Sequence, residues 1–196
     1  MQRLSRLTVA VALLATPALA RASTWQIDPA HTSVQFAVRH LMVSTVRGEL
    51  GKAAGSVTLD ESDLTKSSVE ATVDVTAINT REPRRDEHLK SPDFLDAAKY
   101  PTITFKSTKV EKVADDHYKV TGDLTIRGVT KSTVLDVTGS PKPVNDPMGN
   151  VKLGGSATTR INRQDFGVSW SKSLDGGGVV VGDDVDITID IELVKK

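Results

Sequence analysis

The sequence predicts an all-β fold, an antiparallel barrel of about eight strands with one or two short helices inserted. Three observations support this: apolar and polar residues alternate over long stretches, turn-forming residues separate those stretches, and no strand–helix–strand spacing is present. A two-sheet sandwich would show the same pattern. Closure into a barrel is favoured because long antiparallel strands otherwise leave unpaired edges.

The C-terminal segment carries the clearest strand pattern. Between Asp184 and Leu193, aliphatic residues take every second position, and Asp, Thr or Glu take the positions between them. Such alternation is typical of a strand with one dry and one solvated face. The other segments with this pattern are residues 33–39, 69–75, 102–110, 118–126, 133–138 and 152–161. The turn signals between them lie at residues 60–63, 114–116, 127–128, 141–149 and 175–178.

One segment breaks the alternation. Residues 82–99 are rich in helix formers and contain a Ser91-Pro92 start signal. We expect one or two short helices or helical turns here, which end before Tyr100-Pro101.

Residues 1–22 are expected to be a signal peptide and residues 23–196 a single domain. Arg3 and Arg6 precede an apolar run, and Ala18-Leu19-Ala20 offers the small residues that a signal peptidase reads. A second frame, Ala20-Arg21-Ala22, serves equally well. The apolar run is shorter than the roughly 20 residues of a membrane span, so we expect a cleaved, periplasmic protein.

The composition excludes several classes of protein. Removal of Arg3, Arg6 and Arg21 leaves 22 basic residues against 25 acidic ones, and the two kinds are interspersed. Nucleic-acid binding would require a basic stripe, and disulfides would require cysteine, which is absent. A membrane barrel is disfavoured because 4% aromatic residues cannot readily supply two interfacial girdles.

Catalytic and metal-binding patterns are weak. The four histidines are His31, His40, His88 and His117, and none has the close spacing of a zinc site. His31 and His40 could converge from the same or neighbouring strands, although structural hydrogen bonding is the favoured role. We expect no cofactor or metal. The alternative function is a secreted hydrolase or metal-dependent enzyme that uses His31, His40 or His88.

The most polar spot in the chain is Arg84-Arg85-Asp86-Glu87-His88. The favoured interpretation is a helix surface with exposed ion pairs, which need no function. The second interpretation is a polar rim at the barrel mouth that meets the head group of a ligand.

Several motifs together resemble the YceI-like family of lipocalin-like, polyisoprenoid-binding proteins, in the same order and over nearly the whole predicted domain. The matching residues are Trp25-Gln26-Ile27-Asp28-Pro29-Ala30-His31-Thr32-Ser33-Val34, Phe36, Val38, His40, Ser44, Val46-Arg47-Gly48, Arg85-Asp86-Glu87-His88-Leu89-Lys90-Ser91, Asp93-Phe94, Tyr100-Pro101, Phe105-Lys106-Ser107, Gly122-Asp123-Leu124-Thr125-Ile126-Arg127-Gly128-Val129-Thr130-Lys131, Asp165-Phe166-Gly167 and Val181-Gly182-Asp183-Asp184-Val185.

The resemblance implies a lipocalin-like antiparallel β-barrel of eight strands, often dimeric, with an isoprenoid or other long-chain lipid inside. The family usually places an aromatic residue where this chain has Leu50, and a bulky one near Ala53. Smaller residues there imply more room or a different wall. The partners expected are therefore a lipid, isoprenoid or quinone ligand, a membrane that donates or accepts it, and a second copy of the chain.

The expected role is a periplasmic binding or carrier protein for a long-chain apolar ligand. Only four Phe, two Trp and two Tyr are available to fill a barrel, which favours an internal cavity. A ligand-free interaction module linked to stress is a further alternative. The wall residues that alternation predicts are Val34, Phe36, Val38, Leu50, Val73, Ile103, Phe105, Leu124, Ile126, Phe166, Trp170, Ile187 and Ile189.

Overall fold

The computed structural model describes residues 22–139 and 142–196. Residues 1–21 of the predicted signal peptide lie outside this part. The described residues form eleven strands, one α-helix and three short 3₁₀ helices. The elements are β1 (Ala22–Ile27), β2 (Ser33–His40), β3 (Ser44–Glu49), β4 (Lys52–Asp60), η1 (Leu64–Lys66), β5 (Ser68–Asp74), η2 (Val75–Ala77), α1 (Pro83–Lys90), β6 (Thr102–Ala114), β7 (His117–Ile126), β8 (Val129–Thr138), β9 (Val144–Asn145), β10 (Val151–Asn162), η3 (Arg163–Phe166) and β11 (Val181–Lys195).

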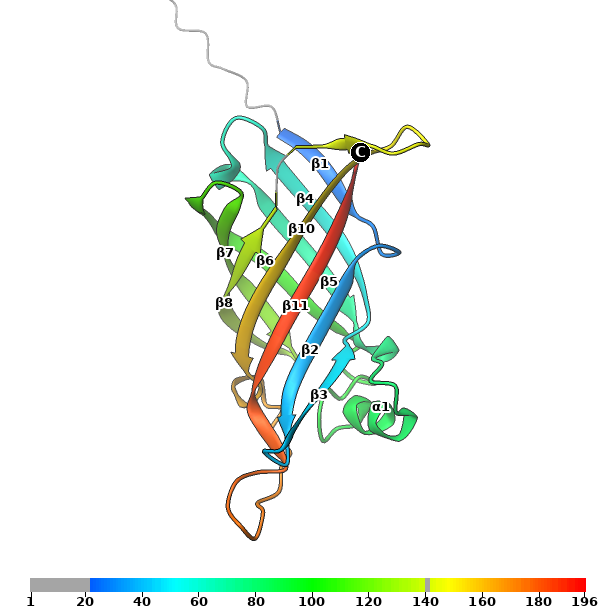
Figure 1. Cartoon of the computed structure of the whole chain (residues 1–196), viewed down its shortest axis with the longest axis vertical. Helices are drawn as coiled ribbons and strands as arrows, with labels where there is room; N and C mark the ends of the chain where they lie inside the picture. Colours follow the sequence, from blue (N-terminus) through cyan, green and yellow to red (C-terminus); the bar gives the residue numbers. More distant parts are fainter. Residues whose placement is uncertain (1–21, 140–141) are drawn as a thin grey trace, which may run out of the picture.

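Eight antiparallel strands close a barrel in the order β1, β4, β5, β6, β7, β8, β10 and β11 (Figure 1). The last strand completes the ring, because β11 pairs with β10 along its length and with β1 through Leu193–Lys195. An earlier part of β11, from Val185 to Asp190, pairs with β2, and β2 pairs with β3. The predicted all-β barrel is confirmed.

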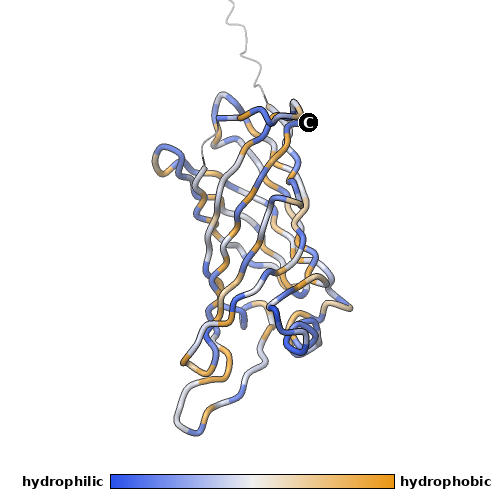
Figure 2. The backbone as a smooth tube through the Cα atoms, turned by 45° about the vertical axis from the view of Figure 1, so that its right-hand side comes forward, coloured by the Kyte–Doolittle hydropathy of each residue, from blue (hydrophilic) through white to orange (hydrophobic). Residues whose placement is uncertain are grey.

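Alternation of side chains builds the core. Hydrophobic and hydrophilic residues follow one another along the barrel strands (Figure 2). In β11, Ile187 and Leu193 are buried, whereas Asp186 and Thr188 are exposed. The inward residues of all the barrel strands therefore face a common interior.

The strands around β4 were not predicted from alternation. β1, β3 and β4 are strands in the structure, and β8 begins at Val129, earlier than the pattern indicated. β4 contains Gly55 at φ 141°, where a Cβ atom would lie 2.1 Å from the carbonyl oxygen of Glu70. This position requires glycine. Val75, predicted as a strand residue, lies instead in η2 after β5 has ended.

The predicted helical segment is present and lies beside the lower end of the barrel in Figure 1, where β2 ends. The side chain of Glu82 accepts a hydrogen bond from the amide of Arg84 at 3.2 Å, and Pro83 occupies the first turn of α1. Turns follow α1 and end before β6, as predicted. Among the described residues, no helix is long and apolar enough to cross a membrane.

Candidate functional site

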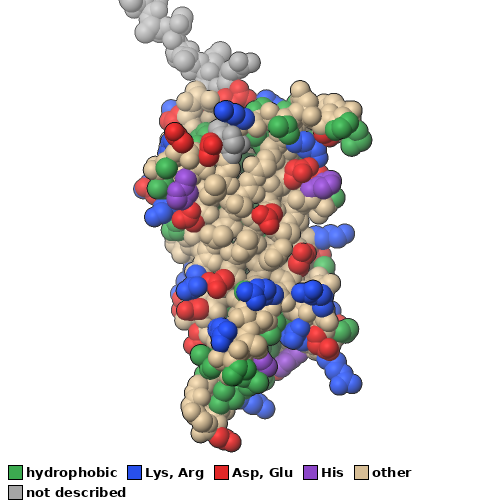
Figure 3. All heavy atoms as spheres, in the orientation of Figure 1, with side chains coloured by type: hydrophobic (Ala, Val, Ile, Leu, Met, Phe, Trp, Pro, Cys, Tyr) green, Lys and Arg blue, Asp and Glu red, His purple; other side chains and the backbone are tan. Residues whose placement is uncertain are grey.

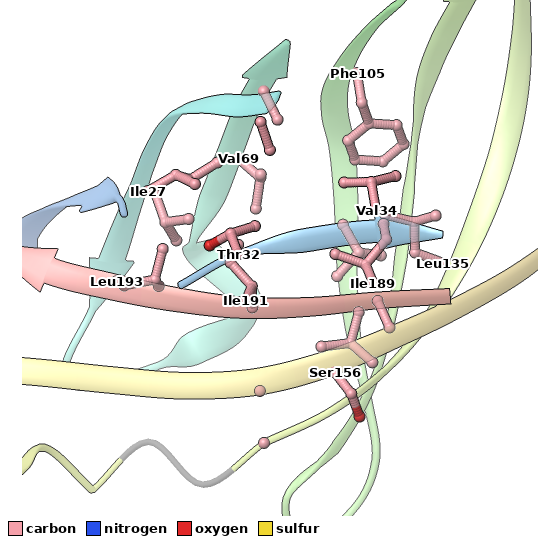
Figure 4. Close-up of a pocket in the computed structure, with 18 of the residues that line it drawn as sticks. Ile27, Thr32, Val34, Val69, Phe105, Leu135, Ser156, Ile189, Ile191 and Leu193 are labelled. Carbon is pink, nitrogen blue, oxygen red and sulfur yellow. The ribbon is translucent and has the colours of Figure 1, made fainter. Parts of the chain in front are cut away.

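The upper part of the barrel encloses a cavity of about 270 Å³. Its lining comes from opposite walls, and the side chains of Ile27, Val34, Val69 and Leu193 point toward one common space (Figure 4). The described residues that line this cavity include no charged side chain. Such a space favours an apolar guest over water, because water needs polar partners.

A second cavity of about 450 Å³ lies below the first, toward α1. Four residues line both cavities, namely Leu50, Ile103, Ile126 and Ile187. The two spaces are therefore neighbours along the barrel, with these four aliphatic side chains between them. The combined space lies within the range of roughly 300–1,000 Å³ that is usual for small-molecule sites.

All thirteen wall residues predicted from alternation line at least one cavity. The shared ones are named above; Val34, Val73, Phe105, Leu124 and Ile189 line the upper cavity, and Phe36, Val38, Phe166 and Trp170 line the lower one. Their contact with a ligand remains a prediction. Alternation missed wall residues on β4 and around α1, such as Ala53, Val57, Leu89 and Phe94.

The lower cavity has a polar mouth. Its charged lining residues are Arg39, Glu82, Arg84, Arg85 and Arg163, so four cations face one anion. Arg39, Glu82 and Arg84 are exposed, which shows that the cavity reaches the surface here. Part of the polar cluster predicted on α1 thus lies at the mouth of the barrel.

The α1 cluster also has a structural part. Thr80 donates from its hydroxyl and its amide to Asp86, at 2.5 and 2.8 Å. Arg85 donates in turn to the hydroxyl and carbonyl oxygens of Thr80, at 2.8 and 2.9 Å. Glu87 pairs with Lys90 at 2.6 Å on the outer surface. Arg84 and Arg85 of the cluster therefore lie at the mouth of the barrel, whereas Glu87 belongs to an exposed ion pair on the helix surface.

His88 forms part of an aromatic wall. Its ring centroid lies 5.0 Å from that of Phe94 and 5.0 Å from that of Trp170, with nearly perpendicular planes. Its Nε2 atom is 2.8 Å from a carboxylate oxygen of Asp93. The carboxylate and the two rings fix the imidazole at the cavity lining, where it packs against apolar surface.

Arg163 anchors the loop at the lower end of the barrel. The side chain is 5% exposed and donates to the carbonyl oxygens of two loop residues and of the first two residues of β11, and to the carboxylate of Asp183. The four carbonyl oxygens belong to Val168, Trp170, Val181 and Gly182, at 2.6, 2.9, 3.1 and 2.8 Å. Burial lowers the pKa of the guanidinium, and Asp183 opposes that shift. Arg163 thus positions Trp170 against the cavity.

An ion-pair network ties the upper end together. Lys152 lies 3.0 Å from Asp28 and 2.7 Å from Glu192, and His31 lies 2.9 Å from Asp28 and 3.7 Å from Glu192. The ligand-type atoms of Asp28, His31 and Glu192 all lie within 4.8 Å of one another. The ammonium group of Lys152 already contacts both carboxylates and His31 contacts Asp28, which favours a structural network over a metal site.

His31 and His40 do not converge. His31 precedes β2 and His40 ends it, so an eight-residue strand separates them. At a rise of about 3.3 Å per residue, that strand holds the two imidazoles at opposite ends of the barrel. His40 lines the lower cavity, and His31 belongs to the upper network.

The His31 network should make stability depend on pH. The hydrogen bond that His31 donates to the Asp28 carboxylate, together with the negative charge of that carboxylate, raises the pKa of His31 above the ordinary 6.5. The pKa of Asp28 is held well below its usual range by His31, the Ala30 amide and Lys152, so its carboxylate stays charged. A raised folded-state pKa stabilises the protein below the unfolded pKa, and this gain is lost as the pH rises through the folded value.

We therefore expect wild type to exceed His31→Gln in Tm by more near pH 5.5, below the ordinary pKa of 6.5, than near pH 8.5, well above it. The measurement is thermal unfolding of both proteins across this range. In an Asp28→Asn background the pH-dependent difference should shrink, because the main partner of the imidazolium is gone. A constant difference between the two Tm values would contradict the assignment.

Comparisons with known proteins agree with this architecture. A family model described as a YceI-like domain matches residues 25–193. A UPF0312 protein of Vibrio parahaemolyticus is 37% identical over 187 residues, which covers 93% of each chain. A UPF0312 protein of Staphylococcus aureus is 36% identical over 163 residues, or 83% of this chain and 92% of that protein.

Solved structures show the same fold. A YceI protein of Campylobacter jejuni superposes with a TM-score of 0.67 at 31% identity, covering 81% of this chain and 90% of that one. BcnA of Burkholderia cenocepacia gives a TM-score of 0.72 at 23% identity, covering 85% and 98%. The second likeness shows the fold alone. The family model and the curated relatives span nearly the whole described barrel, so this chain belongs to the YceI-like family.

Proposed function

We propose that the protein binds one long-chain apolar molecule, such as an isoprenoid, along the two joined cavities. The observation that carries this proposal is the elongated apolar interior, with volumes of about 270 and 450 Å³ that meet at aliphatic residues. Burial of apolar area contributes roughly 25 cal/mol per Å², so a chain of several isoprene units gains many kcal/mol before ordering costs.

A structural neighbour supports the ligand class. A polyisoprenoid binding domain from Saccharophagus degradans superposes with a TM-score of 0.62, covering 88% of this chain and 98% of that one, at 12% identity. The likeness carries the fold, and the ligand named for that domain suits the apolar cavities described above. The charged mouth of the lower cavity leaves room for a polar head group at one end of such a chain.

The proposal includes a place and a role. The predicted signal peptide supports export, which makes the protein a periplasmic carrier or sequestering protein. The environment of three histidines supports a binding role over the enzyme alternative, since each has a structural partner. In the described structure His31 contacts Asp28, His88 contacts Asp93 and His117 contacts Asp136. A replacement of each histidine that abolished a hydrolytic activity without unfolding the protein would favour the enzyme alternative.

Solvent extraction of protein purified from its own host, followed by mass spectrometry, tests the proposal. We expect an apolar species of long chain length at up to one molecule per protein. An Ile126→Arg variant is the matched comparison, because it places a charge between the two cavities. This variant should fold but retain no ligand. A fluorescent long-chain probe checks this result: a folded variant that binds the probe as well as wild type would contradict the proposed site, as would wild type that yields no lipid and binds no probe.

A further inference from the structure

The turn between β2 and β3 exposes three consecutive apolar side chains. Leu41, Met42 and Val43 have 39%, 51% and 78% of their surface exposed. We call these three residues the apolar tip. Hydrophobic side chains gather at the lower end of the molecule, near basic and histidine side chains (Figure 3). Adjacent exposed apolar residues of this size usually mark an interaction surface.

The backbone of the apolar tip makes this choice of residues more unusual. Leu41 and Met42 have φ values of 51° and 60°, and the amide of Val43 donates to the carbonyl oxygen of His40 at 3.1 Å. Two successive left-handed residues in a tight turn favour Asn and Gly. Leu and Met are disfavoured there both by conformation and by exposure, and such outliers often have a function.

The tip is fixed to the mouth of the lower cavity. The amide of Leu41 donates to the carbonyl oxygen of Val180 at 2.8 Å, and Arg39 donates to the carbonyl oxygen of Met42 at 2.7 Å. Arg39, His40 and Val180 all line the cavity. A surface that covered the tip would therefore also meet the opening of the barrel.

Charge around the opening favours an anionic surface. Among the residues that line the lower cavity, Arg39 and Arg84 are exposed cations and Glu82 is the exposed anion, whereas Arg163 is buried and paired with Asp183. In the neighbouring loop, Lys172 and Asp175 are both exposed and offset each other. Cationic residues beside exposed aliphatic ones are the combination that binds anionic membranes.

We propose that the apolar tip inserts into the surface of an anionic lipid bilayer and brings the mouth of the lower cavity to the lipid phase. A second copy of the chain is a poorer occupant, because a stable interface buries about 800 Å² per partner and three aliphatic side chains on one turn supply much less. This inference goes beyond the proposed function, since docking can be measured whatever the barrel holds.

The test is cosedimentation of the protein with vesicles of phosphatidylcholine alone or with phosphatidylglycerol added. The decisive variant is Leu41→Asn/Met42→Gly, because Asn-Gly suits the turn and should leave the fold intact. We expect wild type to bind the anionic vesicles and the variant to bind about tenfold or more weakly. An Arg84→Gln variant should lose part of the preference for anionic vesicles and gain a weaker salt dependence.

The matched control is Val144→Thr/Met148→Gln, which removes exposed apolar side chains in the segment around β9, where 64% and 84% of their surface is exposed. It should bind vesicles like wild type. All variants keep the same N-terminal residues, so any vesicle binding by those residues is the same in each. The difference between wild type and the Asn-Gly variant therefore reports the contribution of the apolar tip. Equal vesicle binding by wild type and the Asn-Gly variant would overturn the proposal. So would a wild-type dimer that the Asn-Gly variant dissolves without any vesicle binding.

Discussion

Replacement of Ala157 by Trp should prevent the barrel from retaining long apolar chains while short ones still bind. Ala157 is 7% exposed on β10 and lines the upper cavity. An indole there takes up space that the far end of a ligand would occupy, while the lower cavity stays open. Loss of about five buried methylene groups costs about 4 kcal/mol, or nearly a thousandfold in affinity.

The measurement is competition by a series of prenyl alcohols of increasing length. Wild type should bind more tightly as the chain grows, and the Trp variant should stop gaining affinity at a shorter length. Thr158→Trp is the control, because Thr158 is the exposed neighbour on the same strand and its side chain faces outward. Identical length profiles for wild type and Ala157→Trp would show that the ligand does not occupy the upper cavity.

Replacement of Arg163 by Met should destabilise the protein by about 3–5 kcal/mol. Met fills part of the same space but leaves four carbonyl oxygens and Asp183 without the donors they now have. The loss of a buried, fully bonded charge has costs of this size. For a domain of this length the Tm should fall by about 6–20 °C.

Thermal unfolding followed by circular dichroism gives that shift, and tryptophan fluorescence shows whether Trp170 has left its packed position. Arg160→Met is the matched control: Arg160 is an exposed residue of β10 that pairs with Asp186 at 2.6 Å. An exposed pair contributes about 1 kcal/mol or less. Equal Tm losses for the two variants would mean that the bonds of Arg163 do not hold the lower loop.

The strands with strict alternation were predictable because burial on one face leaves a pattern of period two. Ile187 and Ile189 on β11 and Leu124 and Ile126 on β7 follow it, so their inward orientation could be predicted without a structure. β4 gave no such signal, because small residues such as Ala53 contribute little contrast between its two faces. Alternation predicts which side chains of a strand point inward. A family resemblance is needed to predict what those side chains enclose.

The lower end of the site could not be predicted from local pattern. Arg163 is buried because loop carbonyl oxygens converge on it, and backbone acceptors leave no trace in the sequence. The apolar tip was not predicted, since nothing in Leu41 and Met42 indicates a left-handed turn. The possible convergence of His31 and His40 does not occur, because an extended strand separates residues that are close in sequence.

The pairing of β11 with both β1 and β10 has a consequence for how the protein folds. The first strand of the barrel has no partner on one side until Leu193–Lys195, the end of the fifteen-residue β11, pair with it. Contacts so distant in sequence form slowly, since the entropy of closing the intervening chain must be overcome first. We therefore expect a polypeptide that lacks β11 to leave the barrel open between β1 and β10.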